Sequence, residues 1–140
     1  MMFWDSSAVV PLIVPSPQSS TLTDHLAADR GVTVWRGTAV ECAAALYRSH
    51  REESIGQAAL DTALLRLHAF TEDADTVAPG EFVRRRASEL VAIHSLRAAV
   101  AFQLAAALAW CEGHPRGERF LALDDRLSEA ARREGFTVLP

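Results

Sequence analysis

Short apolar runs alternate with longer amphipathic stretches along most of the chain. The apolar runs have the length and continuous hydrophobicity of buried strands. They are Met1–Trp4, Val32–Trp35, the weaker Asp75–Ala78, Phe120–Leu123 and Phe136–Leu139. The longer stretches have helical spacing of apolar residues and predict helices at about Ser19–Asp29, Thr38–Arg51, Ser54–Phe70, Gly80–His94, Ser95 or Arg97 to Cys111, and Asp125–Glu134. Ala8–Val14 is an apolar segment that ends at Pro15-Ser16-Pro17.

Strands that alternate with helices predict a parallel sheet with helices on both faces. We therefore expect a three-layer α/β/α sandwich around a central, mostly parallel sheet. The chain has 140 residues, of which 49% are hydrophobic. That is enough for one domain, residues 1–140, with a core that needs no disulfide or structural metal. The helix that ends at Cys111 is apolar on all sides, which predicts a central, buried position.

Composition excludes several kinds of chemistry. The 14 basic residues are all Arg, against 18 acidic residues, so the net charge is −4. Without lysine, the chain has no Schiff-base amine, P-loop lysine or receiver-domain lysine. A net negative charge also excludes binding to nucleic acid through an overall basic surface. Cys42 and Cys111 have no zinc-site spacing, so we expect free thiols in a reducing compartment.

No segment has the sequence pattern of a membrane span or of a secretory signal. The longest apolar run, Ala98–Cys111, is too short to cross a bilayer and contains Gln103. The first residues lack a basic region, and Asp5 interrupts them. We therefore expect a soluble, cytoplasmic protein.

Three acidic residues lie near the carboxyl ends of predicted strands. Two follow a strand directly, and the third lies in the first turn of the helix after a strand. Asp5 follows Met1–Trp4, Asp124 follows Phe120–Leu123, and Glu41 lies in the first turn of the helix after the second strand. Ligands of open α/β sheets bind at the carboxyl ends of the strands. If these strands are neighbours, the carboxylates converge there and offer the hard oxygen ligands that Mg²⁺ and Mn²⁺ prefer.

Each acid also fits a purely structural role. Asp5, before Ser6-Ser7, and Asp124, before the last helix, have the position of helix N-caps. Thr38 and Glu41 have the spacing of a capping box. Caps are commoner than metal ligands for any one such residue, but three acids at three strand ends together favour the metal site.

The three acids lie within longer sequence stretches, which are compared together with one further stretch. These stretches are Phe3–Ala8; Thr38–Glu41 with Ala43–Leu46; His94–Ala99 with Gln103–Ala105; and Phe120–Leu127 with Ala130-Ala131 and Gly135-Phe136. In order and spacing they resemble the motifs of PIN domains, particularly VapC-type toxins, and the likeness runs from Phe3 to Val138. One position departs from the pattern, because the third motif of that family carries an aspartate where this chain has Val100.

This resemblance implies a Mg²⁺- or Mn²⁺-dependent endoribonuclease that is neutralised by a cognate, VapB-like antitoxin. It implies that Asp5 and Asp124 are metal ligands, that Glu41 holds a ligand water or a second ion, and that these three residues are catalytic. Val100 is expected to impair cleavage by this chain. The alternative is a non-catalytic PIN-fold module that binds RNA or an antitoxin. A homodimer is what the family implies.

Contacts with RNA would depend on a few arginines. By spacing from the acids, Arg48 and Arg126 are the best placed of them. The run Arg84–Arg86 is dense enough to bind phosphates but is more typical of a solvated helix face. Leu12–Val14 fits either a rim that meets an antitoxin or ordinary core.

Overall fold

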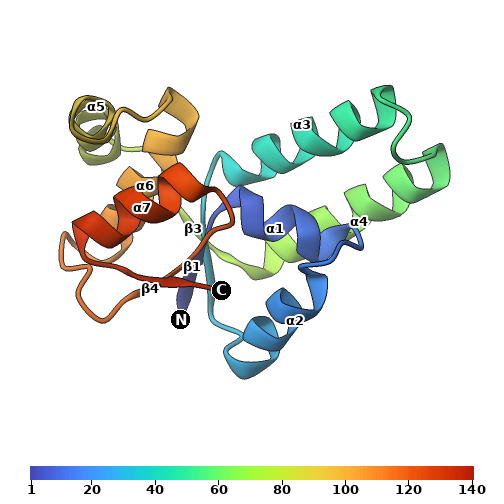
Figure 1. Ribbon diagram of the computed structural model, residues 1–140, viewed down its shortest axis with the longest axis horizontal. Helices are drawn as coiled ribbons and strands as arrows, with labels where there is room; N and C mark the ends of the chain where they lie inside the picture. The colour runs from blue at the N-terminus through green and yellow to red at the C-terminus, as the bar shows by residue number, and fades with distance from the viewer.

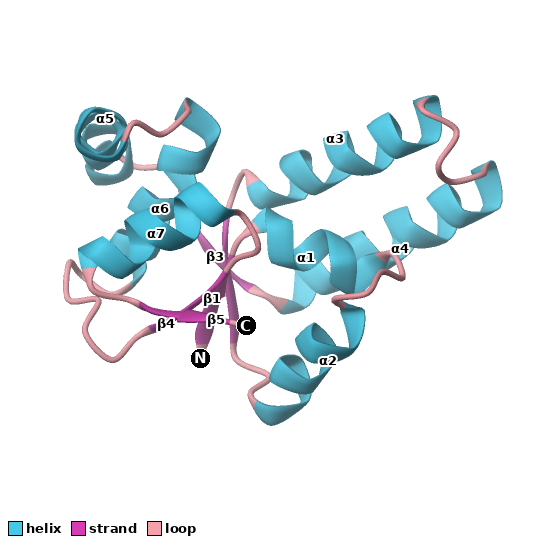
Figure 2. Ribbon diagram, in the orientation of Figure 1, coloured by secondary structure: helices cyan, strands magenta, loops and turns pink.

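The structure is a computed structural model that describes residues 1–140. Seven helices surround a five-stranded sheet in which every pairing is parallel (Figures 1 and 2). The strands are β1 Met2–Trp4, β2 Val32–Trp35, β3 Asp75–Val77, β4 Arg119–Leu121 and β5 Thr137–Leu139. The helices are α1 Ser6–Ile13, α2 Ser19–Ala28, α3 Thr38–Arg51, α4 Gln57–Asp73, α5 Glu81–His94, α6 Ala98–Trp110 and α7 Asp125–Glu134.

The sheet order is β3-β2-β1-β4-β5, so the two strands that precede acids, β1 and β4, are neighbours. They pair through Phe3 with Phe120 and Trp4 with Leu121. Their carboxyl ends therefore lie side by side, as a shared acidic site requires. The predicted three-layer α/β/α fold with a parallel sheet is confirmed.

Alternate residues of β1 point into two separate cores. Phe3 lies in the core beneath α5, α6 and α7, where it stacks on Phe120 with ring centroids 5.4 Å apart. Met2 and Trp4 lie in the core beneath α1 to α4. Figure 1 shows these two groups of helices on opposite sides of the sheet. Burial of both faces explains why the strand sequences are apolar without alternation.

Helix α6 has the central position that its apolar sequence predicts. It is buried almost continuously from Gln103 to Leu108. No single helix of the protein has both the length and the apolar character needed to span a membrane. Both cysteines are free thiols, as predicted, and burial raises the pKa of the Cys42 thiol to about 12.

The main difference from the predicted elements is α1. The apolar segment Ala8–Val14 did not reveal a helix, because a continuous apolar run has no helical periodicity and contains Pro11. The helix begins at Ser6 because the Asp5 side chain accepts a hydrogen bond from the backbone N–H of Ser7. Buried Ala8, Val9 and Ile13 fix it against the sheet.

The second difference is the end of β4. The strand ends at Leu121, not at the predicted Leu123. Beyond Ala122, the backbone N–H groups of Leu123 and Asp124 donate to the side chain of Ser7 instead of to a neighbouring strand. The sheet ladder therefore stops where the candidate site begins.

Candidate functional site

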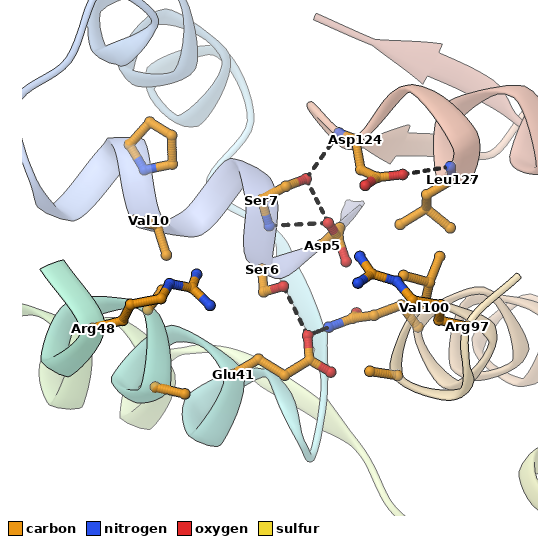
Figure 3. A pocket seen from close by; sticks show the side chains of 15 residues that line it. Asp5, Ser6, Ser7, Val10, Glu41, Arg48, Arg97, Val100, Asp124 and Leu127 are labelled. Carbon is orange, nitrogen blue, oxygen red and sulfur yellow. Dashed lines mark hydrogen bonds between the residues drawn. The ribbon is translucent and has the colours of Figure 1, made fainter. Parts of the chain in front are cut away.

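The three predicted acids line one cleft at the carboxyl ends of β1 and β4. The cleft has a volume of about 530 Å³ (Figure 3). Asp5 follows β1, Asp124 begins α7 after β4, and Glu41 comes from the first turn of α3. The remaining lining residues are Ser6, Ser7, Val10, Pro11, Ala44, Ala45, Arg48, Arg97, Ala99, Val100, Gln103 and Leu127.

Asp5 is the most buried of the three acids, with 3% of its surface exposed. Its Oδ2 accepts hydrogen bonds from the Ser7 backbone N–H, at 2.9 Å, and from the Ser7 hydroxyl. Burial raises the pKa of Asp5 to about 6 despite these hydrogen bonds, and the nearby charge of Glu41 adds to the rise. Burying a carboxylate away from water without a neighbouring cation is unfavourable. The ionised form of Asp5 therefore lowers the free energy of unfolding.

Ser7 links the ends of the two central strands. Its hydroxyl donates to Asp5 and accepts from the backbone N–H groups of Leu123, at 2.9 Å, and Asp124, at 3.3 Å. Figure 3 shows the hydroxyl between Asp5 and Asp124. Ser7 is therefore a hydrogen-bond partner of Asp5 and also holds the backbone that follows β4.

Replacing Ser7 with alanine is expected to lower the free energy of unfolding by about 1–3 kcal/mol, because two part-buried backbone N–H groups lose their acceptor. Urea unfolding at pH 7 measures this loss. Ser88→Ala is the matched control, since the Ser88 hydroxyl bonds only to Arg84 O within its own exposed helix. Equal stability of the two variants would show that Ser7 does not hold the strand ends together.

Glu41 faces the cleft and does not form the capping box considered above. The start of α3 at Gly37 has no side-chain cap. Glu41 Oε2 instead accepts from Ser6 Oγ at 2.7 Å and from Gln103 Nε2 at 2.9 Å. Gln103 also donates to Thr38 Oγ1 at 3.0 Å. This network brings α1, α3 and α6 together around the Glu41 carboxylate.

Each acid keeps one oxygen free for a ligand. Asp124 caps α7 through Oδ1, which accepts from the Leu127 backbone N–H at 2.7 Å. Asp5 and Glu41 use only Oδ2 and Oε2. The cap interpretation of Asp5 and Asp124 is therefore correct but incomplete, because the second oxygen of each accepts no hydrogen bond from the protein.

The oxygen atoms of these acids suit Mg²⁺ or Mn²⁺ in chemical type, but few of them lie close together. The free oxygens are hard ligands, and the burial of Asp5 favours a neighbouring cation. No three acidic, histidine or cysteine side chains lie close enough together to hold one ion. The chain would thus supply at most two carboxylates, an arrangement common for Mg²⁺, which takes its other ligands from water and substrate phosphates.

Two arginines enter the same cleft from opposite sides. In Figure 3, the guanidinium groups of Arg48 on α3 and Arg97 before α6 both reach toward the acids. Neither forms an ion pair within 4.0 Å of an acid, so both remain available to a phosphate. Val100, in the first turn of α6, lines the cleft with apolar surface beside them.

Sequence reasoning missed Arg97 and the role of Gln103. Gln103 carried a signal, since it is the lone polar residue of an otherwise apolar helix. Arg97 lies in the stretch His94–Ala99 that resembles the third motif, but nothing in the sequence marked its side chain as part of the cleft.

The other predicted contact residues have separate locations. Arg126 lies outside the acidic cleft and lines a neighbouring one. In the run Arg84–Arg86, Arg84 pairs with Glu81 on the solvated face of α5, whereas Arg86 is partly buried and pairs with Glu89 and with Glu134 of α7. In the segment Leu12–Val14, Ile13 is buried core and its two neighbours pack against that core.

Comparison with known proteins finds likeness in structure but none in sequence. No family model matches the chain, and no curated protein sequence matches it. The chain is similar in structure to PAE2754 from Pyrobaculum aerophilum, with a TM-score of 0.69 and 14% identity over 98% of this chain and 87% of that one. It is also similar to FitAcB from Neisseria gonorrhoeae, with a TM-score of 0.66 and 14% identity over 100% and 97% of the two chains. At this identity the likeness shows the fold, which is PIN-like.

Proposed function

We propose that this protein is a PIN-type endoribonuclease of the VapC kind that depends on Mg²⁺ or Mn²⁺ and is weakened by Val100. The observation that carries the proposal is the buried carboxylate of Asp5, whose pKa is raised to about 6, in a cleft with Asp124 and Glu41. Such perturbed carboxylates in a cleft are typical of catalytic and metal sites. The PIN-like fold and the sequence motifs support the same reading.

In this mechanism the free oxygens of Asp5 and Asp124 would hold the ion. When bound, a divalent cation lowers the pKa of a coordinated water and neutralises charge on the phosphate. Glu41, fixed by Ser6 and Gln103, would accept a hydrogen bond from water at its free Oε1 and so orient it. Arg48 and Arg97 would bind phosphates of the RNA at either side of the cleft.

The same proposal includes a VapB-like antitoxin as partner, a homodimer and a cytoplasmic location, which follow from the sequence resemblance. The acids lie in a cleft of about 530 Å³, and a segment of the antitoxin would occlude them by filling it.

A second candidate is a PIN-fold module that binds RNA or an antitoxin without cleaving RNA. The absence of a group of three metal-binding side chains favours it, as does the apolar surface of Val100 among the acids. The two candidates differ in metal binding, which only the first requires.

Asp124→Asn is expected to lower Mn²⁺ affinity by about tenfold or more and to reduce RNA cleavage in parallel, because it removes a charged oxygen ligand. Calorimetric Mn²⁺ titration and cleavage of a labelled RNA measure the two effects. Asp24→Asn, at an exposed position of α2, is the control and should change neither. If Asp124→Asn binds Mn²⁺ as the natural chain does, the metal site is elsewhere and Asp124 is only a helix cap.

A further inference from the structure

A second cleft of about 350 Å³ lies beside the acidic one. It is formed by the turn between α5 and α6 and by the exposed face of α7. Its lining residues are His94, Ser95, Asp125, Arg126, Glu129, Ala130 and Arg133. Consecutive residues at the start of α7 line the two clefts. Asp124 and Leu127 line the first, and Asp125 and Arg126 line the second.

His94 is the buried polar group of this second cleft. Its side chain is 5% exposed, and its Nε2 lies 2.7 Å from Glu134 Oε1. Glu134 is itself held by Arg86 at 2.8 Å. The other ring nitrogen, Nδ1, is buried and has no hydrogen-bond partner. Nearly all buried polar atoms in proteins have a partner, so this nitrogen calls for a ligand or a water molecule.

The polar groups around His94 offer both donors and acceptors. Arg126 and the Ser95 hydroxyl donate, and neither is engaged in an ion pair or hydrogen bond of its side chain. Asp125 accepts and is likewise free, whereas Glu129 and Arg133 pair with each other at 3.0 Å. The two carboxylates of this cleft would repel an isolated phosphate group. Ala130 is its single apolar lining residue, so an apolar ligand would leave the surrounding polar groups unpaired.

A nucleobase matches this mixture, because its edge presents donors and acceptors side by side. Among the bases, guanine offers O6 and N7 to an arginine, the commonest specific contact of this residue with a base. Its N1–H and N2–H groups can donate to a carboxylate. Arg126 and Asp125 supply one partner of each kind from consecutive positions of α7.

We propose that this second cleft binds a guanine base of an RNA strand whose backbone crosses the acidic cleft. Arg126 binds the O6 and N7 edge, and Asp125 accepts from the N1–H and N2–H groups. The cleft thereby sets a sequence preference next to the phosphate at Asp5 and Asp124. The assignment of RNA rests on the proposed function, whereas recognition of guanine rests on the lining residues alone.

Calorimetric titration with guanosine and uridine 5′-monophosphates in EDTA tests the proposal without any cleavage step. The guanine nucleotide should bind about tenfold more tightly than the uracil nucleotide, as expected for one bidentate base contact. Arg126→Gln should abolish this preference. Arg132→Gln, also exposed on α7 but outside the cleft, is the control and should keep it.

Equal affinity for the two nucleotides, no binding of either, or an unchanged preference in Arg126→Gln would overturn the proposal. These outcomes are separate from the fate of the proposed function. Metal-dependent cleavage of RNA without base preference would refute guanine recognition and leave the ribonuclease intact. Guanine-specific binding by a chain that never cleaves RNA would support guanine recognition and refute the ribonuclease.

Discussion

Replacing Val100 with aspartate is expected to raise both Mn²⁺ affinity and the rate of RNA cleavage by roughly 100-fold, or about 2.7 kcal/mol, because it adds a charged oxygen ligand to the cleft. Val100 lines the cleft together with Asp5, Asp124 and Glu41. An acid there adds the oxygen ligand that the PIN pattern has at this position. The helix should tolerate the change, because Val100 lies in the first turn of α6, where a negative charge is favourable.

Two variants separate the ligand effect from simple changes of shape and charge. Val100→Asn has the shape of the acid without its charge and should gain little. Val91→Asp adds the same charge at an exposed position of α5, away from the cleft, and should gain nothing. Equal metal-dependent cleavage by the chain with Val100 and by Val100→Asp would show that Asp5, Glu41 and Asp124 suffice. No cleavage by either would favour the binding module.

Asp5→Asn is expected to stabilise the metal-free protein at pH 7 by up to about 3 kcal/mol, the free energy that corresponds to a pKa raised from 3.8 to about 6. A carboxyl group with a raised pKa binds its proton more tightly when folded. The destabilisation of the folded state by ionised Asp5 is therefore absent below pH 4, grows as the pH rises, and is complete above pH 6. The neutral amide of asparagine does not incur it.

Urea unfolding in EDTA at pH 4 and pH 7 measures this difference. Between pH 4 and pH 7 the unsubstituted chain should lose up to about 3 kcal/mol of stability through ionisation of Asp5, and Asp5→Asn should not lose it. Mn²⁺ at pH 7 should stabilise the natural chain more than the variant, because a cation offsets the buried charge. Asp24→Asn controls for loss of an exposed acid. An Asp5→Asn variant that is no more stable at pH 7 would contradict the account of a strained carboxylate.

Much of the fold follows from the local sequence, and the site follows from the fold. Alternating strands and helices predict a parallel sheet, and acids at strand ends predict a shared cleft once the strands are neighbours. The order β3-β2-β1-β4-β5 is not encoded in periodicity, because strands buried on both faces look alike. For a related reason the only sign of helix α1 was the cap position of Asp5, since Ala8–Val14 is apolar throughout.

The electrostatics of the site depend on contacts between residues far apart in the chain. The raised pKa of Asp5 results from burial by neighbouring elements. The link from Ser7 to Asp124 joins residues separated by 117 positions, and the link from Gln103 to Glu41 joins residues separated by 62. Arg126 shows the limit of spacing arguments. It lies only two residues after Asp124, but it lines the second cleft, because helix positions two apart do not share a face.

The most direct test of the metal site is anomalous X-ray scattering from crystals of the natural chain equilibrated with a high concentration of MnCl₂. Asp5 and Asp124 each offer a free oxygen in the same cleft, so a manganese peak is expected beside both carboxylates. The same measurement on Asp5→Asn should show a weaker peak or none. A fully ordered cleft without manganese, or manganese bound only to other acids, would contradict the claim that these two residues share a divalent ion.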